Sequence, residues 1–369
     1  MRIGVACGGT GGHIFPGLAT ARELRRRGHE VALWLAGKQV ETAAVEGWDG
    51  PVITAQAEGF DHGLSWRSLG TIWKLSGAVR ACTKVMKADP PSILLAMGSY
   101  ACVGPLGAAF RLGVPYVLHE SNVVPGRAVQ LFARRATAVG GCFEETGYHL
   151  KRRDLVLTGM PLRCALEEAA LAHRRAAKAP ARFTLLVMGG SGGARRLNEV
   201  IPEALAELVR GEMPFDVVHL TGKAGEQSVR AAYARLGLPV EVHGFTHDMA
   251  ALYGRASLAL CRSGAATCAE LAAFGIPALF VPYPFAVRNH QMANARAMEK
   301  AETADVVADA DLTVAWLASY LREQMAHPER LAKMRTTAQV RGSVHGVAAL
   351  ADLVERCGGG HGPGSTTYR

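Results

Sequence analysis

The sequence predicts an α/β protein made of two doubly wound domains, each built on a parallel sheet. Short apolar runs alternate with helical stretches along most of the chain, which is the pattern of repeated βα units. This alternation starts a second time at Arg182. The chain has 369 residues, more than one typical domain, so the two series of units are expected to form two domains.

The first series contains five apolar runs that are expected to form buried strands. Short runs rich in aliphatic residues are typical of parallel strands that are covered on both faces. Helical segments separate several of them, and Gly28, which ends one such segment, is a typical helix C-cap. The predicted strands lie within residues 2–7, 30–37, 92–98, 115–120 and 136–142.

The second series repeats this pattern in the other half of the chain. The stretch before Phe183 is polar and rich in alanine, and the turn "TGMPLR" at 158–163 places the boundary near residue 160. We therefore expect an N-terminal domain of residues 1–160, a C-terminal domain of residues 161–357 and a disordered tail, residues 358–369, without core-forming side chains. The predicted strands lie within residues 182–188, 215–222, 240–245, 258–264 and 277–284.

A glycine-rich loop follows the first strand of each predicted domain, at Gly8–Gly12 and at Gly189–Gly193. In parallel sheets such loops lie at the carboxyl ends of the strands, where helix N-termini direct N–H groups at anions. Glycine allows the backbone to approach a phosphate or a sugar closely. The net charge of +9 also favours anionic partners. Two such loops predict an anionic ligand held in a cleft between the domains.

Several classes of protein are excluded or disfavoured by the motifs. The loop "GGTGGHIF" lacks the spacing of a nicotinamide site, the next strand, "LWLAGK", ends without an acidic residue, and no Walker motif is present. The "DAD" at 309–311 precedes a helical run and is expected to cap it rather than to hold a metal ion. The eight cysteines form no C-x-x-C pair, so we expect no structural zinc, no other metal and no cofactor.

The chain is expected to be cytosolic and reduced. The apolar start "RIGVAC" is too short for a signal peptide, because a glycine loop interrupts it. No apolar run approaches the roughly 20 residues that a spanning helix needs.

A serine hydrolase is an alternative function that the second glycine loop raises. The segment "GGSGG" satisfies G-x-S-x-G, with Ser191 as nucleophile between a strand and a helix. Asp248 and His290 follow in the chain order that such a triad requires. This interpretation leaves the first glycine loop, "GGTGGH", without a role.

Six segments together resemble the MurG family of bacterial glycosyltransferases, over about residues 1 to 305. The resemblance implies two domains of the GT-B fold and an inverting transfer of N-acetylglucosamine (GlcNAc) from UDP-GlcNAc. The acceptor would be the muramoyl C4 hydroxyl of lipid I, an undecaprenyl diphosphate, giving lipid II for peptidoglycan synthesis. Another UDP-sugar transferase of the GT-B fold stays open as an alternative. The segments are "GGTGGHIFPGLA", "LHESNVVPGRA", "TGMPLR", "MGGSGGARRLN", "CRSGAATCAELAAFGIPALFVPYP" and "NHQMANARAM".

The resemblance also implies roles for individual residues. His13 would be the general base that takes the proton of the acceptor hydroxyl, or a residue that only orients a ligand; His119 and Glu120 are the other candidate bases. Glu270, one turn into a predicted helix, would accept hydrogen bonds from the ribose hydroxyls. The implied donor site consists of Thr10, Gly11, Gly12, Asn122, Arg163, Ser191, Thr246, Ala265, Ala266, Thr267, Cys268, Ala269, Glu270 and Gln291.

The sequence departs from the family pattern close to Gln291. Phe285 stands where the family commonly has a histidine, and Arg288 and Asn289 stand where it commonly has an acidic pair. These departures concern individual contacts to the sugar or the acceptor and not the class of reaction.

The helical run at 65–87 predicts a membrane-binding face. A core-facing stripe is expected at Ile72, Leu75, Val79, Cys82 and Met86. A separate face combines aromatic, apolar and basic residues, which suits an anionic membrane surface; its alternative is a second buried stripe between domains. That face carries Trp66, Leu69, Trp73, Arg80, Lys84 and Lys87.

The resemblance implies a peripheral protein at the cytoplasmic face of the inner membrane. Its partners would be UDP-GlcNAc, lipid I, the anionic membrane surface and other proteins of cell-wall synthesis, with no nucleic acid.

Overall fold

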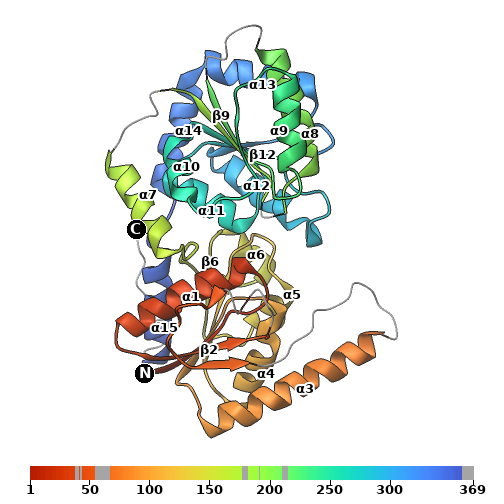
Figure 1. The fold of residues 1–369 in the computed structure, drawn as a ribbon. Coiled ribbons are helices and arrows are strands. Elements are labelled where there is room, and N and C mark those ends of the chain that lie inside the picture. The colour runs from red at the N-terminus through yellow and green to blue at the C-terminus, as the bar shows by residue number, and fades with distance from the viewer. Residues whose placement is uncertain are drawn as a thin grey trace. The chain divides into compact units, whose positions relative to one another are not determined.

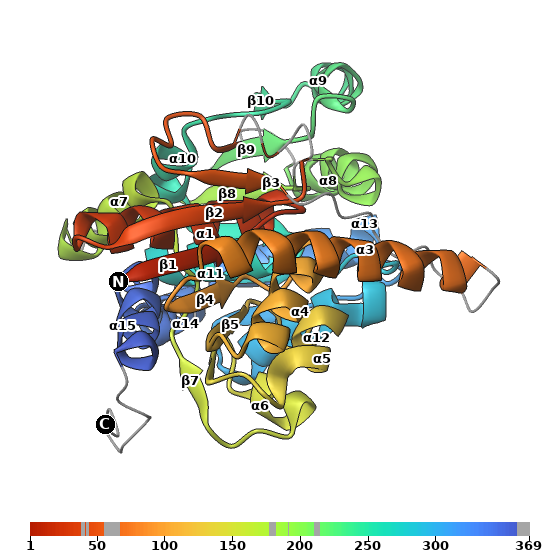
Figure 2. The ribbon, with the colours of Figure 1, turned by 90° about the horizontal axis from the view of Figure 1, so that it is seen from below.

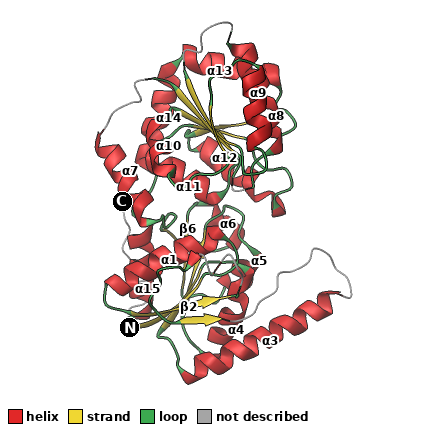
Figure 3. Cartoon of the chain, in the orientation of Figure 1, coloured by secondary structure: helices red, strands yellow, loops and turns green. Residues whose placement is uncertain are grey.

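The chain forms two compact α/β units in a computed structural model. The structure describes residues 1–37, 41, 44–54, 67–176, 182–190, 192–209 and 215–359, and of residues 67–74 only the backbone. One unit consists of Met1–Arg163 together with His345–Arg369, and the other of Cys164–Val344. Each contains a parallel sheet flanked by helices (Figure 3), which confirms the predicted fold class.

The first unit is built on a seven-stranded parallel sheet with the order β3-β2-β1-β4-β5-β6-β7. Its described strands are β1 (Arg2–Ala6), β2 (Glu30–Leu35), β3 (Val52–Thr54), β4 (Ile93–Ala96), β5 (Tyr116–Glu120), β6 (Ala138–Gly141) and β7 (Leu155–Leu157). The helices are α1 (Gly11–Arg26), α3 (Arg67–Ala88), η1 (Tyr100–Cys102), α4 (Val103–Leu112), α5 (Arg127–Ala133), α6 (Glu145–Leu150) and α15 (Gly346–Gly358), most of them labelled in Figure 1.

The alternation of side chains along β1 divides the core of the first unit into two layers. Val5 packs in a cluster with residues of α1 and α15, whereas its neighbour Ala6 packs in a cluster with residues of α3, α4 and α5. The strands are therefore apolar on both faces, and this makes continuous apolar runs such as β4 recognisable in the sequence.

Helix α3 runs beside α4 (Figure 2), and part of its predicted core stripe is confirmed. Cys82 and Met86 are buried. Val79 packs closely against Gly107 of α4, because a Cβ added to that glycine would lie 2.6 Å from the Val79 side chain. Three basic residues of the predicted membrane face, Arg80, Lys84 and Lys87, are exposed. Trp66 and the side chains of Leu69, Ile72 and Trp73 lie outside the described residues.

Helix α15 corrects the predicted domain composition. Residues 345–357 were expected in the C-terminal domain, but α15 packs on the first unit, against α1 and strands β4, β5 and β6. Leu350 and Val354 are buried in the first core, and Arg27 forms ion pairs of 2.6 Å with Asp352 and Glu355. The apolar face of α15 does not itself reveal which sheet it covers, so the sequence pattern assigned it to its neighbours in the chain.

The second unit is built on a six-stranded parallel sheet with the order β10-β9-β8-β11-β12-β13. Its described strands are β8 (Thr184–Met188), β9 (Asp216–Leu220), β10 (Glu241–His243), β11 (Leu258–Cys261), β12 (Ala278–Phe280) and β13 (Ala304–Val306). The helices are α7 (Cys164–Ala176), α8 (Arg195–Leu208), α9 (Glu226–Arg235), α10 (Met249–Arg255), α11 (Ala265–Phe274), η2 (Val287–Asn289), α12 (His290–Lys300), α13 (Val314–Ala326) and α14 (Pro328–Arg341).

Each of the ten predicted strand segments contains a strand of the structure, and three further strands were not predicted. These three, β3, β7 and β13, are edge strands of three residues each, and they are only partly buried. An edge strand of this length needs no continuous apolar run, so its sequence lacks the signal that marks a central strand.

Candidate active site

The glycine loop of the first unit connects β1 to α1 and is held by the buried carboxylate of Glu41. Glu41 is 1% exposed, and its two oxygens accept the N–H groups of Gly9 and Gly37 at 2.7 Å each. Ser99 adds a hydrogen bond from its hydroxyl to the carbonyl of Gly8. Gly9 has a φ of 115°, which disfavours any residue with a side chain. The loop is therefore a fixed structure, and the Gly9 N–H is already bound to Glu41.

His13 lies in the first turn of α1 and contacts the residue that precedes the helix. The Nδ1 atom of its ring is 2.9 Å from Oγ1 of Thr10, the N-cap residue of α1. If Nδ1 carries the proton and donates it to Thr10, then Nε2 is the nitrogen that can accept a proton from a substrate.

Arg163 and Gly11 lie close to the same helix start. The guanidinium of Arg163 is 5.6 Å from the ring centroid of Phe15, and a Cβ at Gly11 would lie 3.2 Å from that ring. The structure thus brings Thr10, Gly11, Gly12, His13 and Arg163 together at the start of α1.

The imidazole of His13 is neutral at neutral pH. Burial of the ring in its low-dielectric surroundings lowers the pKa of His13 to about 4, and the charge that His119 would carry adds to this effect. His13 as a whole residue is partly buried. The sequence alone predicted an unperturbed pKa, because burial of a side chain depends on the tertiary fold.

His119 and Glu120, the other candidate bases, have structural partners. Nε2 of His119 donates a hydrogen bond to the carbonyl of Gly159, and burial lowers the pKa of His119 to about 4. Glu120 accepts the backbone N–H groups of Asn122 and Gly126 at 2.9 and 2.8 Å, and burial raises its pKa. Glu120 thus fixes the loop after β5, which carries the predicted ligand residue Asn122, whereas His119 ties β5 to the segment after β7.

The second glycine loop follows β8 and borders a pocket of about 630 Å³ within the second unit. Gly193 has a φ of 75°, and a Cβ at this position would lie 2.3 Å from the carbonyl oxygen of Thr221. The residues that line the pocket come from this loop, from the starts of α8 and α11 and from the segment after β12. They are Gly189, Gly190, Gly192, Gly193, Ala194, Arg195, Arg196, Glu199, Arg262, Gly264, Thr267, Tyr283, Pro284, Phe285, Gln291 and Asp309.

Helix α11 points its N-terminus at this pocket. Gly264 is its N-cap, and the first intrahelical bond runs from the N–H of Cys268 to the carbonyl of Gly264. The N–H groups of Ala265, Ala266 and Thr267 precede that bond, as in any helix start, and are oriented to bind an anion. The backbone of this segment is therefore suited to the role implied for it.

The side chains that follow Thr267 on α11 differ in their access. Cys268 is buried in the core, and burial raises the pKa of its thiol, so its side chain offers nothing to a ligand. Ala269 and Glu270 are partly exposed, and Glu270 accepts a hydrogen bond of 2.6 Å from the hydroxyl of Tyr253.

Two more of the predicted donor residues have defined partners in the second unit. Gln291 lines the pocket, and its Oε1 accepts the N–H of Tyr283 at 2.9 Å. Oγ1 of Thr246 accepts the N–H of Asp248 in the turn before α10. Ser191 lies outside the described residues.

Asp309 forms an ion pair and is neither a helix cap nor part of a metal site in this structure. Arg262 donates to its carboxylate at 2.5 Å and to the carbonyl of Val281 at 2.9 Å. The residue that caps α13 is Thr313, whose hydroxyl accepts the N–H of Trp316. The prediction that "DAD" caps this helix is therefore wrong. Among the residues that the structure describes, no group of three His, Cys, Asp or Glu side chains is arranged for a metal ion.

The hydrolase interpretation has no support in the described part of the chain. Asp248 is the N-cap of α10 and accepts the N–H of Ala251 at 3.0 Å. Nδ1 of His290 donates to the carbonyl of Val287 at 2.8 Å. Each side chain thus has a local structural partner, and neither contact is that of a catalytic triad.

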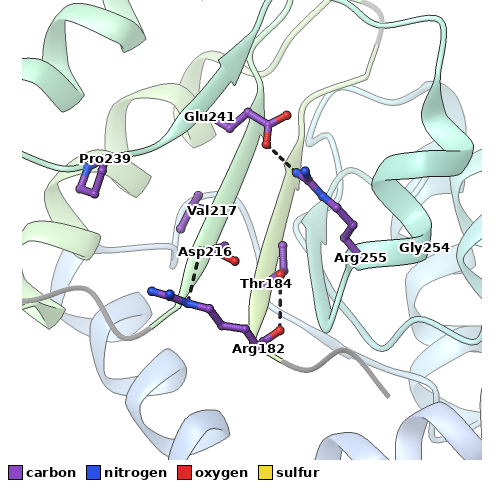
Figure 4. Close-up of a pocket in the computed structure, with 8 residues that line it drawn as sticks. All are labelled: Arg182, Thr184, Asp216, Val217, Pro239, Glu241, Gly254 and Arg255. Carbon is purple, nitrogen blue, oxygen red and sulfur yellow. Dashed lines mark hydrogen bonds and ion pairs between the residues drawn. The ribbon is translucent and has the colours of Figure 1, made fainter. Parts of the chain in front are cut away.

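A second hollow of about 510 Å³ lies at the opposite, amino-terminal edge of the same sheet (Figure 4). Its charged side chains pair with one another: Arg182 with Asp216 at 3.3 Å, and Arg255 with Glu241 at 2.5 Å. Ligands of parallel sheets bind at the carboxyl ends of the strands, so the pocket at the glycine loop is the better candidate for the anionic ligand.

Comparisons with known proteins identify the family of the chain. The glycosyltransferase family 28 N-terminal domain matches residues 3–140, and the family 28 C-terminal domain matches residues 184–354. The UDP-N-acetylglucosamine--N-acetylmuramyl-(pentapeptide) pyrophosphoryl-undecaprenol N-acetylglucosamine transferase of Sinorhizobium fredii is 36% identical, over 97% of this chain and 96% of that protein. The Acidithiobacillus ferrooxidans enzyme of the same name is 37% identical, over 96% and 98%.

This chain belongs to the MurG family of glycosyltransferases. The crystal structure of Acinetobacter baumannii MurG superposes with a TM-score of 0.79 at 28% identity, covering 96% of this chain and all of that one (100%). The glycosyltransferase of kitacinnamycin, at 20% identity and a TM-score of 0.66, shares the fold. The predicted GT-B fold and the predicted class of enzyme are confirmed.

Sequence reasoning missed three arginines that line the pocket at the second glycine loop, and Tyr253, which contacts Glu270. Arg195 and Arg196 stand at the start of α8, directly after the glycine loop, and this position alone could have identified them. Arg262 directly follows β11, where parallel strands commonly present functional residues. Tyr253 carried no local signal, because its contact with Glu270 joins two separate helices.

Proposed function

We propose that this protein transfers GlcNAc from UDP-GlcNAc to the muramoyl C4 hydroxyl of lipid I, with inversion, to form lipid II. The observation that carries the proposal is the pocket of the second unit, where a glycine loop and the starts of α8 and α11 line one hollow. The names of the relatives supply the donor, the acceptor and the transferred sugar.

The donor diphosphate would lie at the two helix starts in this pocket. Unpaired N–H groups and the helix dipole favour negative charge there, and Arg196 adds positive charge beside the glycine loop, whereas Arg195 pairs with Glu199. The same groups stabilise the charge that builds up on the leaving UDP when the bond to the sugar breaks. Glu270 would accept hydrogen bonds from the ribose hydroxyls.

The acceptor hydroxyl would meet His13 of the first unit. Inversion requires one displacement at the anomeric carbon, so the attacking C4 oxygen must lose its proton to a base in that step. The low pKa of His13 keeps the ring neutral, and the contact from Nδ1 to Thr10 leaves Nε2 to take this proton. In this mechanism Thr10 holds the ring in the productive tautomer.

A transfer assay tests this function. The protein is mixed with radiolabelled UDP-GlcNAc and lipid I in detergent, and label is followed into the lipid extract. We expect label in a lipid product only when lipid I is present, and far less label from UDP-glucose or UDP-galactose. Hydrolysis of the donor without a labelled lipid, or equal use of the three sugars, would contradict the proposal.

We also propose that the protein binds the cytoplasmic face of the membrane peripherally through α3. None of the helices in the described ranges is long and apolar enough to cross a bilayer. Arg80, Lys84 and Lys87 are exposed on α3, while Cys82 and Met86 of the same helix are buried. A basic face beside buried apolar residues favours binding to anionic lipid headgroups.

Reversing these three charges is expected to weaken membrane binding about a hundredfold. Each Lys or Arg near an anionic surface contributes about 1 kcal/mol to binding, so Arg80→Glu, Lys84→Glu and Lys87→Glu together remove about 3 kcal/mol. Cosedimentation with phosphatidylglycerol vesicles measures the change. The matched control reverses Arg322, Lys333 and Arg341, which are exposed on the second unit. Equal weakening in both triple variants would reject α3 as the binding face.

A further inference from the structure

Tyr253 is a buried tyrosine whose hydroxyl points at Glu270, the residue proposed to bind the ribose. It lies in α10, is 2% exposed, and donates a hydrogen bond of 2.6 Å to Oε2 of Glu270 in the neighbouring helix α11. A distance this short is typical of a hydroxyl bound to an ionised carboxylate. The hydroxyl thus fixes one oxygen of the carboxylate proposed to contact the donor.

Packing fixes the tyrosine ring itself. The ring centroid of Tyr253 lies 5.1 Å from that of Phe274, which is also buried and lies one turn after Glu270 on α11. Helix α10 is in turn fixed at its start by the Asp248 cap. Of the two partners, Glu270 has the longer and more flexible side chain and is only partly buried. The bond therefore restricts Glu270 more than it restricts Tyr253.

We propose that Tyr253 is a positioning residue for the donor nucleotide, which orients the carboxylate of Glu270 toward the ribose hydroxyls. This inference rests on the proposed function, because it takes Glu270 as a ribose ligand. Holding the carboxylate in one rotamer before binding removes part of the entropic cost of recognising UDP. Tyr253 acts only through Glu270 and touches no substrate atom in this proposal.

Tyr253→Phe tests the proposal, because it removes the hydroxyl and keeps the ring. Isothermal titration calorimetry measures the binding of UDP and of its dideoxyribose analogue, which lacks both ribose hydroxyls. We expect the variant to bind UDP about threefold to tenfold more weakly, the effect of one net hydrogen bond, and to bind the analogue as the parent does. In the transferase assay KM for UDP-GlcNAc should rise by the same factor, with kcat unchanged.

Two further variants separate positioning from a general loss of stability. Tyr320→Phe removes another buried tyrosine hydroxyl that donates to a carboxylate, Asp305 at 2.8 Å, in the same unit. It is expected to lower the melting temperature without changing either affinity. In a Glu270→Ala background, Tyr253→Phe is expected to cause no additional loss of UDP affinity.

Each outcome decides between the alternatives. Equal weakening of UDP and of the analogue by Tyr253→Phe would show a merely structural role and overturn the proposal, as would unchanged UDP affinity. A further loss in the Glu270→Ala background would also overturn it. Failure of the parent protein to bind UDP would instead reject the proposed function, and this inference with it.

Discussion

Replacement of His13 by alanine is expected to lower kcat at least a hundredfold while the affinity for UDP-GlcNAc stays close to that of the parent protein. Removal of a general base typically costs about 10²–10⁴-fold in rate, because the proton must then leave without a positioned acceptor. His13 lies on the first unit, whereas the residues proposed to bind the diphosphate and the ribose of UDP lie on the second. Steady-state transfer to lipid I measures kcat, and calorimetry with UDP-GlcNAc measures the affinity.

The pH profile provides a second measurement on the same residue. Only neutral His13 can accept a proton, and its pKa is lowered to about 4, so kcat/KM should stay level from pH 7 to about 5 and fall as the pH drops through about 4. An unperturbed imidazole would lose activity already near pH 6.5. Burial of neutral His13 and His119 also lowers the free energy of unfolding in acid, because the unfolded chain binds protons that the folded one does not. Circular dichroism at each pH separates the two effects.

The control for His13→Ala is His243→Ala, in the edge strand β10 of the second sheet, where the ring contacts Glu241. This variant should keep kcat. A kcat of His13→Ala within a few fold of the parent value would reduce His13 to a positioning residue. His119 and Glu120 would then need testing as bases, despite the structural partners of both.

Gly193→Val is expected to destabilise the second unit by about 3 kcal/mol or more and to abolish measurable UDP binding. A side chain at a φ of 75° costs about 1–2 kcal/mol, and a Cβ 2.3 Å from the carbonyl oxygen of Thr221 adds an overpacking cost of about 1–3 kcal/mol. The opposing loop cannot yield easily, because a Cβ at Gly222 would itself meet Gly193 at 2.7 Å. Differential scanning calorimetry and UDP titration measure the two effects.

Gly237→Ala is the matched control for the backbone conformation. Gly237 has a φ of 67°, but nothing lies within 4 Å of the Cβ it would gain, so this variant isolates the conformational cost of about 1–2 kcal/mol. Gly192→Ala changes the same loop without the conformational cost or the overpacking cost, because Gly192 has no positive φ and nothing lies within 4 Å of the Cβ it would gain. If the Gly193→Val protein were as stable as the Gly237→Ala protein and bound UDP normally, the close approach of the loops at Gly193 and Gly222 would be contradicted.

Local patterns predicted the central strands and both glycine loops. Strands such as β4 and β8 are buried throughout, so their composition alone identifies them. His13 and Glu270 were proposed from motifs, and the structure places His13 in the first turn of α1 and Glu270 within α11.

Contacts between distant segments could not be predicted in the same way. Glu41 binds the N–H of Gly9 from 32 residues away in the sequence, and Tyr253 of α10 binds Glu270 of α11. The lowered pKa of His13 arises from tertiary burial, which no single segment encodes. Arg262 and Asp309 form their ion pair only because the folded sheet brings the segments after β11 and β13, which stand on either side of β12, to the same edge.

The position of α15 has a consequence for the synthesis of the chain on the ribosome. The first sheet is translated early, but the face that contains Ile3, Leu95 and Val117 packs with Leu350 of α15, which is made after the whole second unit. The second unit, Cys164–Val344, is contiguous and complete before α15 is translated. Domains that fold during translation fold as their residues become available, so the unit that starts first finishes last. A nascent chain that ends before His345 therefore holds a complete second unit and a first sheet whose face is covered by α1 but not by α15, which leaves apolar surface open to chaperones and proteases.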